Sequence, residues 1–345
     1  MIEVQGLTKR YGDFMAVDDI SFRVERGEIV GFLGLNGAGK TTTMRMLTCY
    51  MPATSGSANI AGFDVFEQSL EVRRRIGYLP ERPPLYTDMT VRSYLAYVAT
   101  LSGMARGEIE DRIDAVEDRC GLADVDGRLI GHLSKGYRQR VGLAQALVHN
   151  PDVLIMDEPT SALDPAQRYE IRTLIKELAQ DHTILLSTHI LPEVEDVCER
   201  VVIINEGRVV ARERIDELSS SVAHAEKVYV ETFDKPDDFD ALAMKINDVK
   251  SVEKSEEAPN GYFIESALGK DVRRPLSDLV HEKGWGLKEL RALQPTLEDI
   301  FLKLVTRDTV ERERAEAAED AAEEAEEANK RDEPDDKEET KEAKE

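Results

Sequence analysis

The chain has 345 residues, 41% of them hydrophobic, so it is long enough for two or three domains with buried cores. Its formal net charge of −24 argues against nonspecific nucleic-acid binding as a main role. No apolar run approaches the roughly 20 residues of a membrane helix, and the first residues lack the basic and then apolar pattern of a signal peptide. We therefore expect any membrane role to be that of a peripheral subunit.

The three cysteines, Cys49, Cys120 and Cys198, are far apart and lack the spacing of a metal site. Their odd number argues against a disulfide framework. We expect a reducing compartment in which each thiol is a small core residue.

The first 30 residues are expected to form short antiparallel strands at 2–4, 16–17 and 20–24. Tyr11 lies in a polar loop between them. It can be a surface anchor, or a ring on which a purine stacks, since base–aromatic stacking contributes about 1–3 kcal/mol. The spacing alone leaves both interpretations open.

Residues 34–42 match the pattern G-x-x-x-x-G-K-[ST] of phosphate-binding loops. Residues 28–33 are expected to form a buried strand, and the residues from 43 open a helix whose N-terminal dipole favours anions. Backbone N–H groups and the Lys40 ammonium would bind phosphates, and the Thr41 hydroxyl would bind Mg²⁺. The predicted contact residues are Asn36, Gly37, Ala38, Gly39, Lys40, Thr41 and Thr42.

Residues 52–80 continue as turns and short strands, and the proline-rich stretch at 80–84 predicts a loop. From 88 to 150 the apolar spacing becomes that of amphipathic helices. The first such face consists of Val91, Tyr94, Leu95, Val98 and Leu101. We expect a helical insertion between two parts of a nucleotide-binding sheet.

Ser134 is expected to cap a helix whose body runs over 141–148 and which ends at Asn150 and Pro151. Together with Gly136 and the free N–H groups of the helix start, Ser134 offers a second anion site. The alternative is an ordinary capped helix.

Residues 153–156 are apolar and two carboxylates follow, which predicts a buried strand that ends at a ligand-binding edge. Asp157 would hold Mg²⁺ through water, opposite Thr41. Glu158 would polarise the water that attacks a γ-phosphate. A charged strand end without such a role is the alternative.

A turn at 161–165 precedes another amphipathic helix, and residues 183–187 predict a further buried strand. His189 lies at the end of this strand, where it is either structural or bonded to a γ-phosphate oxygen. Residues 201–210 are expected to form a hairpin.

The C-terminal third changes in composition. Residues 216–225 are polar and serine-rich and are expected to be a linker. Residues 226–305 predict a small α+β domain, an antiparallel sheet with helices on one face and a last helix at 296–305. Residues 311–345 carry seventeen acidic and seven basic side chains, which predicts a disordered tail, with docking on a basic partner as the alternative.

Together these pieces resemble the ATP-binding subunit of an ABC transporter, over about residues 1–220 and in six motifs that follow the family's order. Residues 34–42 resemble its Walker A loop and residues 153–157 its Walker B strand. Tyr11 resembles the adenine-stacking aromatic and Glu158 the catalytic base. The resemblance implies ATP and Mg²⁺ as ligands and ATP hydrolysis as the reaction.

The sequence LSKGY at 133–137 takes the place of the family signature L-S-G-G-Q and keeps Ser134 and Gly136. Asp164 belongs to the D-loop, and His189 matches the switch histidine. Glu81 stands where a glutamine is usual in the Q-loop. Its carboxylate is a candidate Mg²⁺ contact that alters the coupling to a membrane subunit.

In this family two ATPase domains pair head to tail, so the signature of one caps the ATP held by the other. The resemblance thus implies a homodimer, or a pair with a paralogue, that drives a separate membrane permease. It implies a cytoplasmic location, peripheral on the inner face of the cell membrane. Residues 76–81 and 85–91 look most like the ABC-2 exporter branch, which includes drug-efflux and gliding-motility subunits. No nucleic-acid partner is expected.

The implied fold is α/β. A P-loop ABC ATPase domain at 1–220 has a mixed-sheet core, an antiparallel β subdomain and a helical subdomain at about 88–150; the α+β domain at 226–305 and the tail follow.

Two other functions also fit the phosphate-binding loop. A soluble ABC-type ATPase acting on ribosomes or DNA typically has paired domains or a coiled-coil insertion, whereas this sequence has a single Walker A loop. A phosphoryl-transferring kinase would leave residues 133–137 and 161–164 unexplained.

Overall fold

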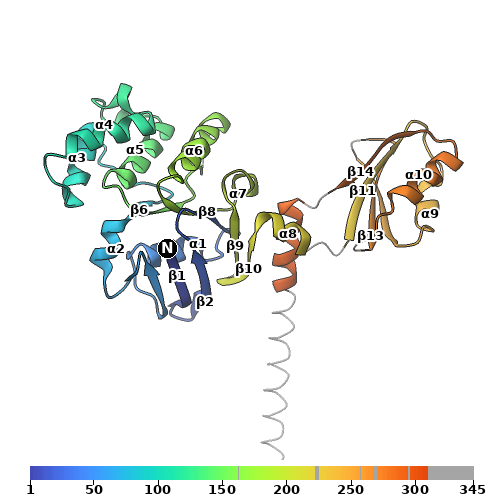
Figure 1. The fold of residues 1–345 in the computed structure, drawn as a ribbon, viewed down its shortest axis with the longest axis horizontal. Coiled ribbons are helices and arrows are strands. Elements are labelled where there is room, and N and C mark those ends of the chain that lie inside the picture. Colours follow the sequence, from blue (N-terminus) through green and yellow to red (C-terminus); the bar gives the residue numbers. More distant parts are fainter. Residues whose placement is uncertain (162, 222–224, 257, 268–269, 294–295, 310–345) are drawn as a thin grey trace, which may run out of the picture.

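The computed structural model describes residues 1–161, 163–221, 225–256, 258–267, 270–293 and 296–309. The tail predicted at 311–345 lies outside these residues. Figure 1 shows two sheets and a group of helices packed together in the N-terminal part, and a smaller sheet set apart from them.

A six-stranded sheet forms the centre of the N-terminal part, in the order β10-β9-β3-β8-β7-β6. Its strands are β3 (Ile29–Leu33), β6 (Ile76–Leu79), β7 (Val153–Asp157), β8 (Thr183–Thr188), β9 (Arg200–Asn205) and β10 (Arg208–Arg214). All neighbours are parallel except the β9–β10 hairpin at one edge. Every residue of β3, β7 and β8 is buried, which explains their continuous apolar runs. The predicted mixed sheet is confirmed.

Three helices follow strands of this sheet and contribute buried side chains to its two faces. They are α1 (Lys40–Leu47), α6 (Pro165–Leu178) and α7 (Leu191–Val197). Each begins just after a strand end, so the turns between strand and helix gather at the carboxyl edge of the sheet.

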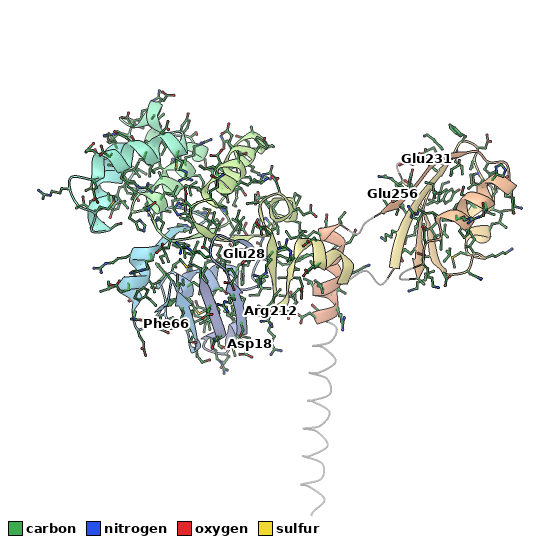
Figure 2. The ribbon with its side chains drawn as sticks, in the orientation of Figure 1. Asp18, Glu28, Phe66, Arg212, Glu231 and Glu256 are labelled. Atoms are coloured by element: carbon green, nitrogen blue, oxygen red, sulfur yellow. The ribbon has the colours of Figure 1, made fainter. Side chains whose placement is uncertain are left out.

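A four-stranded antiparallel sheet of order β2-β1-β4-β5 packs against the central sheet. It consists of β1 (Ile2–Tyr11), β2 (Phe14–Val24), β4 (Ser55–Ile60) and β5 (Phe63–Asp64), and helix α2 (Ser69–Arg75) follows it. The strands predicted at 16–17 and 20–24 are one longer strand. Asp18 accepts from Arg208 at 2.6 Å and Arg212 donates to the Ser21 carbonyl at 2.8 Å, which ties β2 to β10 (Figure 2).

The predicted helical insertion is confirmed as α3 (Val91–Leu101), α4 (Ile109–Cys120) and α5 (Lys135–Leu147), with 3₁₀ turns at Ala123–Val125 and Ile130–His132. Thr90 caps α3 by accepting from the Ser93 N–H at 3.2 Å. Arg92 of α3 pairs with three carboxylates of α4, those of Glu110, Asp114 and Glu117. Of the apolar face predicted on α3, Val91, Tyr94 and Leu95 are buried and Val98 is partly buried, which confirms that part of the prediction. Leu101, at the end of the helix, is 69% exposed and does not pack inward as predicted.

The small sheet has the strand–helix–strand–strand–helix–strand order of a ferredoxin-like unit. Its elements are β11 (Ala225–Thr232), α9 (Phe239–Ala243), β12 (Val249–Lys254), β13 (Gly261–Ala267), α10 (Arg273–Glu282) and β14 (Leu287–Leu293). The strands are antiparallel in the order β12-β13-β11-β14. Both helices cover one face, where the Phe239 ring stacks on Tyr262 at 4.1 Å. The predicted α+β arrangement is confirmed.

The two segments that precede and follow the small sheet in the sequence differ from the sequence-based expectation. The stretch expected to be a linker at 216–225 contains helix α8 (Ile215–Ser221), because Leu218 is buried in the N-terminal core and anchors an otherwise polar segment. The last described helix spans residues 297–309. Its buried side chains Leu297, Ile300 and Phe301 also join the N-terminal core, so it packs there rather than on the small sheet.

Replacing Phe301 by Ala is expected to lower the free energy of unfolding of the N-terminal part by about 3 kcal/mol, because it leaves a cavity in that core. Phe301 is 5% exposed. Its neighbour Leu302 is 55% exposed, so Leu302→Ala is the matched control and is expected to cost much less. Urea unfolding of the full chain measures both, and equal losses in the two variants would contradict this packing.

Candidate active site

The phosphate loop joins β3 to α1 and passes through backbone angles that favour glycine. Gly37 has φ 85° and Gly39 has φ 102°, both in the left-handed region. A Cβ on Gly39 would in addition lie 2.6 Å from the Ala16 carbonyl oxygen. Helix α1 begins at Lys40, so the positive end of its dipole lies at the loop, as an anion site requires.

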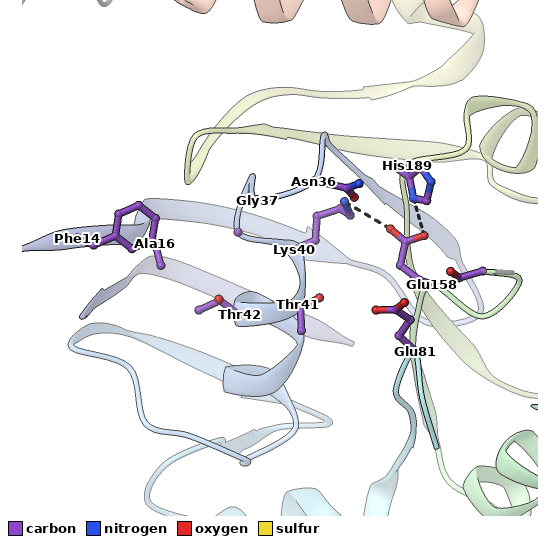
Figure 3. A pocket seen from close by; sticks show the side chains of 12 residues that line it. Phe14, Ala16, Asn36, Gly37, Lys40, Thr41, Thr42, Glu81, Glu158 and His189 are labelled. Carbon is purple, nitrogen blue, oxygen red and sulfur yellow. Dashed lines mark hydrogen bonds and ion pairs between the residues drawn. The ribbon is translucent and has the colours of Figure 1, made fainter. Parts of the chain in front are cut away.

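A cavity of about 410 Å³ lies beside this loop at the carboxyl edge of the central sheet (Figure 3). Side chains reach it from the loop and α1, from β2, and from the segments that follow β6, β7 and β8. Its lining residues are Phe14, Ala16, Asn36, Gly37, Gly39, Lys40, Thr41, Thr42, Glu81, Glu158, Ser161 and His189. Most residues predicted to contact ATP in one chain therefore lie together. Ala38 is buried instead, and its carbonyl accepts from the Gly207 N–H at 3.0 Å.

Lys40 brings a nearly buried cation to the cavity, since it is only 6% exposed. Its ammonium donates to the carbonyl oxygens of Gly34 at 2.8 Å and Leu35 at 3.2 Å. It also lies 3.4 Å from a carboxylate oxygen of Glu158 (Figure 3). The Lys40 ammonium is the donor and positive charge among these oxygens, so it can also bind the oxygens of a phosphate chain.

Glu158 is held in an unusual backbone conformation, with φ 51°. Such a conformation is costly for a residue other than glycine and is concentrated at functional sites. Its second carboxylate oxygen is 2.8 Å from Nδ1 of His189, which comes from the end of β8. With the proton on Nδ1, the ring donates to the carboxylate and leaves Nε2 as an acceptor. The pair combines a buried base with a half-exposed imidazole.

Asp157 is the last residue of β7, directly before Glu158, and is buried, with Ser187 Oγ donating to its carboxylate. Burial raises the pKa of Asp157 above its ordinary value, while hydrogen bonds from Ser187 and Thr41 act in the opposite direction. The contact between Thr41 and Asp157 joins a hydroxyl and a carboxylate oxygen, the hard donors that Mg²⁺ prefers. These two residues therefore fit a magnesium ion.

Ser134 and Gly136 of the signature and Asp164 of the D-loop are not among the residues that line this cavity, whereas Ser161, the first residue of the D-loop, does line it. Ser134 caps α5, and its Oγ accepts from the Tyr137 N–H at 3.3 Å. A Cβ on Gly136 would lie 2.6 Å from the Gln167 side chain, so the start of α5 lies close to α6. Asp164 caps α6 by accepting from the Gln167 N–H at 2.9 Å. Within one chain, then, the structure does not bring the second anion site to the first.

Tyr11 is not among the residues that line the cavity. Its hydroxyl donates to Met51 Sδ at 3.1 Å, and the Lys9 ammonium is 5.3 Å from its ring centroid. Its partner in the β1–β2 register is Phe14, which is 65% exposed and does line the cavity. Stacking of adenine on Tyr11 stays a prediction. Sequence reasoning missed Phe14 and Ala16, although an aromatic at the start of a strand, three residues after Tyr11, was a visible signal.

The chain is similar in sequence to known proteins. The sequence profile of the ABC transporter family matches residues 17–161. The bacitracin transport ATP-binding protein BcrA of Bacillus licheniformis is 36% identical over 90% of this chain and 99% of its own length. Both the P-loop segment and the C-terminal region are thus part of the similarity.

Solved structures agree with the sequence comparison. An ATP-binding subunit of an ABC transporter superposes with a TM-score of 0.59 at 33% identity, over 64% of this chain and 92% of its own. The dimeric bacterial ABC transporter cassette MJ0796 superposes with a TM-score of 0.58 at 25% identity, over 62% of this chain and 99% of its own. Among the described residues, no helix has both the length and the apolar character needed to cross a membrane.

Proposed function

The chain belongs to the ATP-binding subunits of ABC transporters, and we propose that it is the ATPase of an exporter, working as a head-to-tail dimer on a separate membrane permease. Members of this family hydrolyse ATP, and the chain is such an ATPase. The observation that supports the ATPase site is the meeting of Lys40, Glu158 and His189 in one cavity at the end of the P-loop strand.

We assign a role to each residue of the candidate site from its position. The loop N–H groups and Lys40 bind the β- and γ-phosphates. Thr41 and Asp157 would hold Mg²⁺, which would neutralise charge on the phosphate oxygens. Glu158 accepts the proton of the attacking water, because a carboxylate beside Lys40 is placed next to the phosphate. His189 fixes that carboxylate through its Nδ1 contact.

The head-to-tail dimer accounts for the second anion site. Ser134 and Gly136 lie at the start of α5, outside the cavity that holds Lys40. In a dimer with C₂ symmetry, each copy presents this helix start to the ATP bound by the other. The dimeric cassette among the similar structures supports such pairing.

The exporter class and the permease partner rest on similarity. The relative named for bacitracin transport and the likeness of residues 76–81 and 85–91 to the ABC-2 branch support them. A permease partner places the chain on the cytoplasmic face of the membrane as a peripheral subunit. Action on ribosomes or DNA is not favoured, because the relatives are transport proteins and the net charge is −24.

Affinity purification of the full chain from detergent-solubilised membranes tests this partner. We expect a membrane protein with several spanning helices to co-purify in a stable ratio and to stimulate ATP hydrolysis. Recovery with ribosomes, and no enrichment in the membrane fraction, would overturn the proposal.

Replacing Glu81 by Gln is expected to raise the Mg²⁺ concentration for half-maximal hydrolysis about fivefold, because it removes a hard anionic oxygen from the site. Glu81 lines the same cavity as Thr41 and Glu158. A Mg²⁺ titration of phosphate release at fixed ATP measures the shift. Glu67→Gln, at an exposed position, is the control, and an unchanged Mg²⁺ profile in Glu81→Gln would remove Glu81 from the metal site.

A further inference from the structure

A buried carboxylate on α7 lies close to the candidate active site and has no role in the scheme above. Glu193 is 2% exposed, although glutamate is rarely buried to this extent. Burying a carboxylate costs free energy unless its oxygens accept hydrogen bonds. Apolar packing of α7 is already supplied by Val194 and Val197, so the helix does not need Glu193 for burial.

Both carboxylate oxygens of Glu193 accept from threonine hydroxyls on different segments. Thr160 Oγ1 donates to Oε1, and Thr188 Oγ1 donates to Oε2 at 3.1 Å. Thr188 Oγ1 also accepts from the Ile190 N–H at 3.0 Å, which fixes its orientation. One buried side chain thus bridges the segment after β7 and the end of β8.

These two threonines flank the reacting groups. Thr160 comes two residues after Glu158, and Thr188 comes directly before His189. The Glu158 N–H donates to the Ser187 carbonyl at 3.0 Å, and beyond that bond the two segments leave the sheet ladder. From there on, Glu193 and the Glu158–His189 contact at 2.8 Å join them.

We propose that Glu193 is a positioning residue for ATP hydrolysis, which ties the segment after β7 to the end of β8 and so keeps Glu158 and His189 in contact. The proposal rests on the function proposed above. It explains why a carboxylate stands where an apolar side chain would satisfy packing alone. Small displacements of a general base lower the rate of the chemical step far more than they change substrate binding.

The variant Glu193→Gln tests this directly, because it keeps the shape of the side chain but leaves a single oxygen to accept two hydroxyl donors. We expect kcat to fall about tenfold while KM and the affinity for a fluorescent ATP analogue change less than about twofold. Glu195→Gln is the matched control, since Glu195 is two residues along α7, exposed, and accepts from the Leu297 N–H at 3.2 Å. It should leave kcat unchanged.

A double-mutant cycle separates positioning from general stability. If Glu193 acts through the Glu158–His189 contact, Glu193→Gln adds little to the loss already caused by His189→Ala, because the contact is gone. A full further loss of about tenfold in the His189→Ala background would overturn the proposal. So would a kcat of Glu193→Gln within about twofold of wild type, or a parallel loss of ATP affinity.

Thr160→Val provides a second variant in case Glu193→Gln does not fold. It removes the hydroxyl that donates to Oε1 of Glu193 and leaves α7 unchanged. We expect it, like Glu193→Gln, to lower kcat and to leave KM unaffected. Wild-type levels of hydrolysis in Thr160→Val would contradict the proposal. Failure of the proposed function is distinguishable, because in that case the wild-type chain itself would show no ATP hydrolysis.

Discussion

Replacing Glu158 by Gln is expected to lower the rate of ATP hydrolysis about a thousandfold while leaving the affinity for ATP nearly unchanged. Gln keeps the shape of the side chain but cannot accept the proton of the attacking water. In the proposed mechanism, phosphate binding depends on the loop and on Lys40, whose hydrogen bonds to the Gly34 and Leu35 carbonyls do not involve Glu158. Phosphate release and equilibrium binding of a fluorescent ATP analogue, measured on the same preparation, separate the two effects.

Glu177→Gln is the control for this experiment, because Glu177 is exposed on α6 and the substitution is chemically identical. It should hydrolyse ATP at the wild-type rate. Normal hydrolysis in Glu158→Gln would remove Glu158 from the role of base. Loss of ATP binding in that variant would mean that the carboxylate near Lys40 organises the loop rather than the water.

Local signals in the sequence were enough to predict the elements that build the site. The apolar run at 153–156 and the glycine pattern at 34–42 each specify their own backbone, and both elements appear at the predicted positions. Parallel strands then bring their carboxyl ends to one edge, which is why Lys40, Glu158 and His189 meet although they are far apart in the chain.

Features that depend on contacts between distant segments could not be predicted in this way. No pattern in the residues around Glu158 indicates its positive φ. The two hydroxyl groups that donate to Glu193 come from other segments of the fold, so the sequence near Glu193 does not indicate them either. The helix at 297–309 shows the same limit. Its amphipathic spacing predicts a helix. The spacing does not indicate that Leu297 and Phe301 pack into the N-terminal core, from which the small sheet separates them in the sequence.

Mixing two inactive variants is expected to restore ATP hydrolysis if the signature of one copy completes the site of the other. Lys40→Ala removes the cation proposed to bind phosphate, and Ser134→Arg blocks the start of α5; each alone should lower hydrolysis on the order of a hundredfold. Half of randomly paired dimers are mixed, and each mixed dimer has one intact composite site, so phosphate release should recover to about a quarter of wild type. Activity no greater than the sum of the two variants would contradict the shared site.

The control mixture pairs Lys40→Ala with Glu158→Gln and is expected to show no recovery. The Lys40 ammonium and the Glu158 carboxylate lie 3.4 Å apart in one cavity of one chain. In the mixed dimer, one site therefore lacks the cation and the other lacks the base, and neither is intact. Recovery in this mixture would mean that Glu158 acts across the dimer, a geometry that its hydrogen bond with His189 of the same chain opposes.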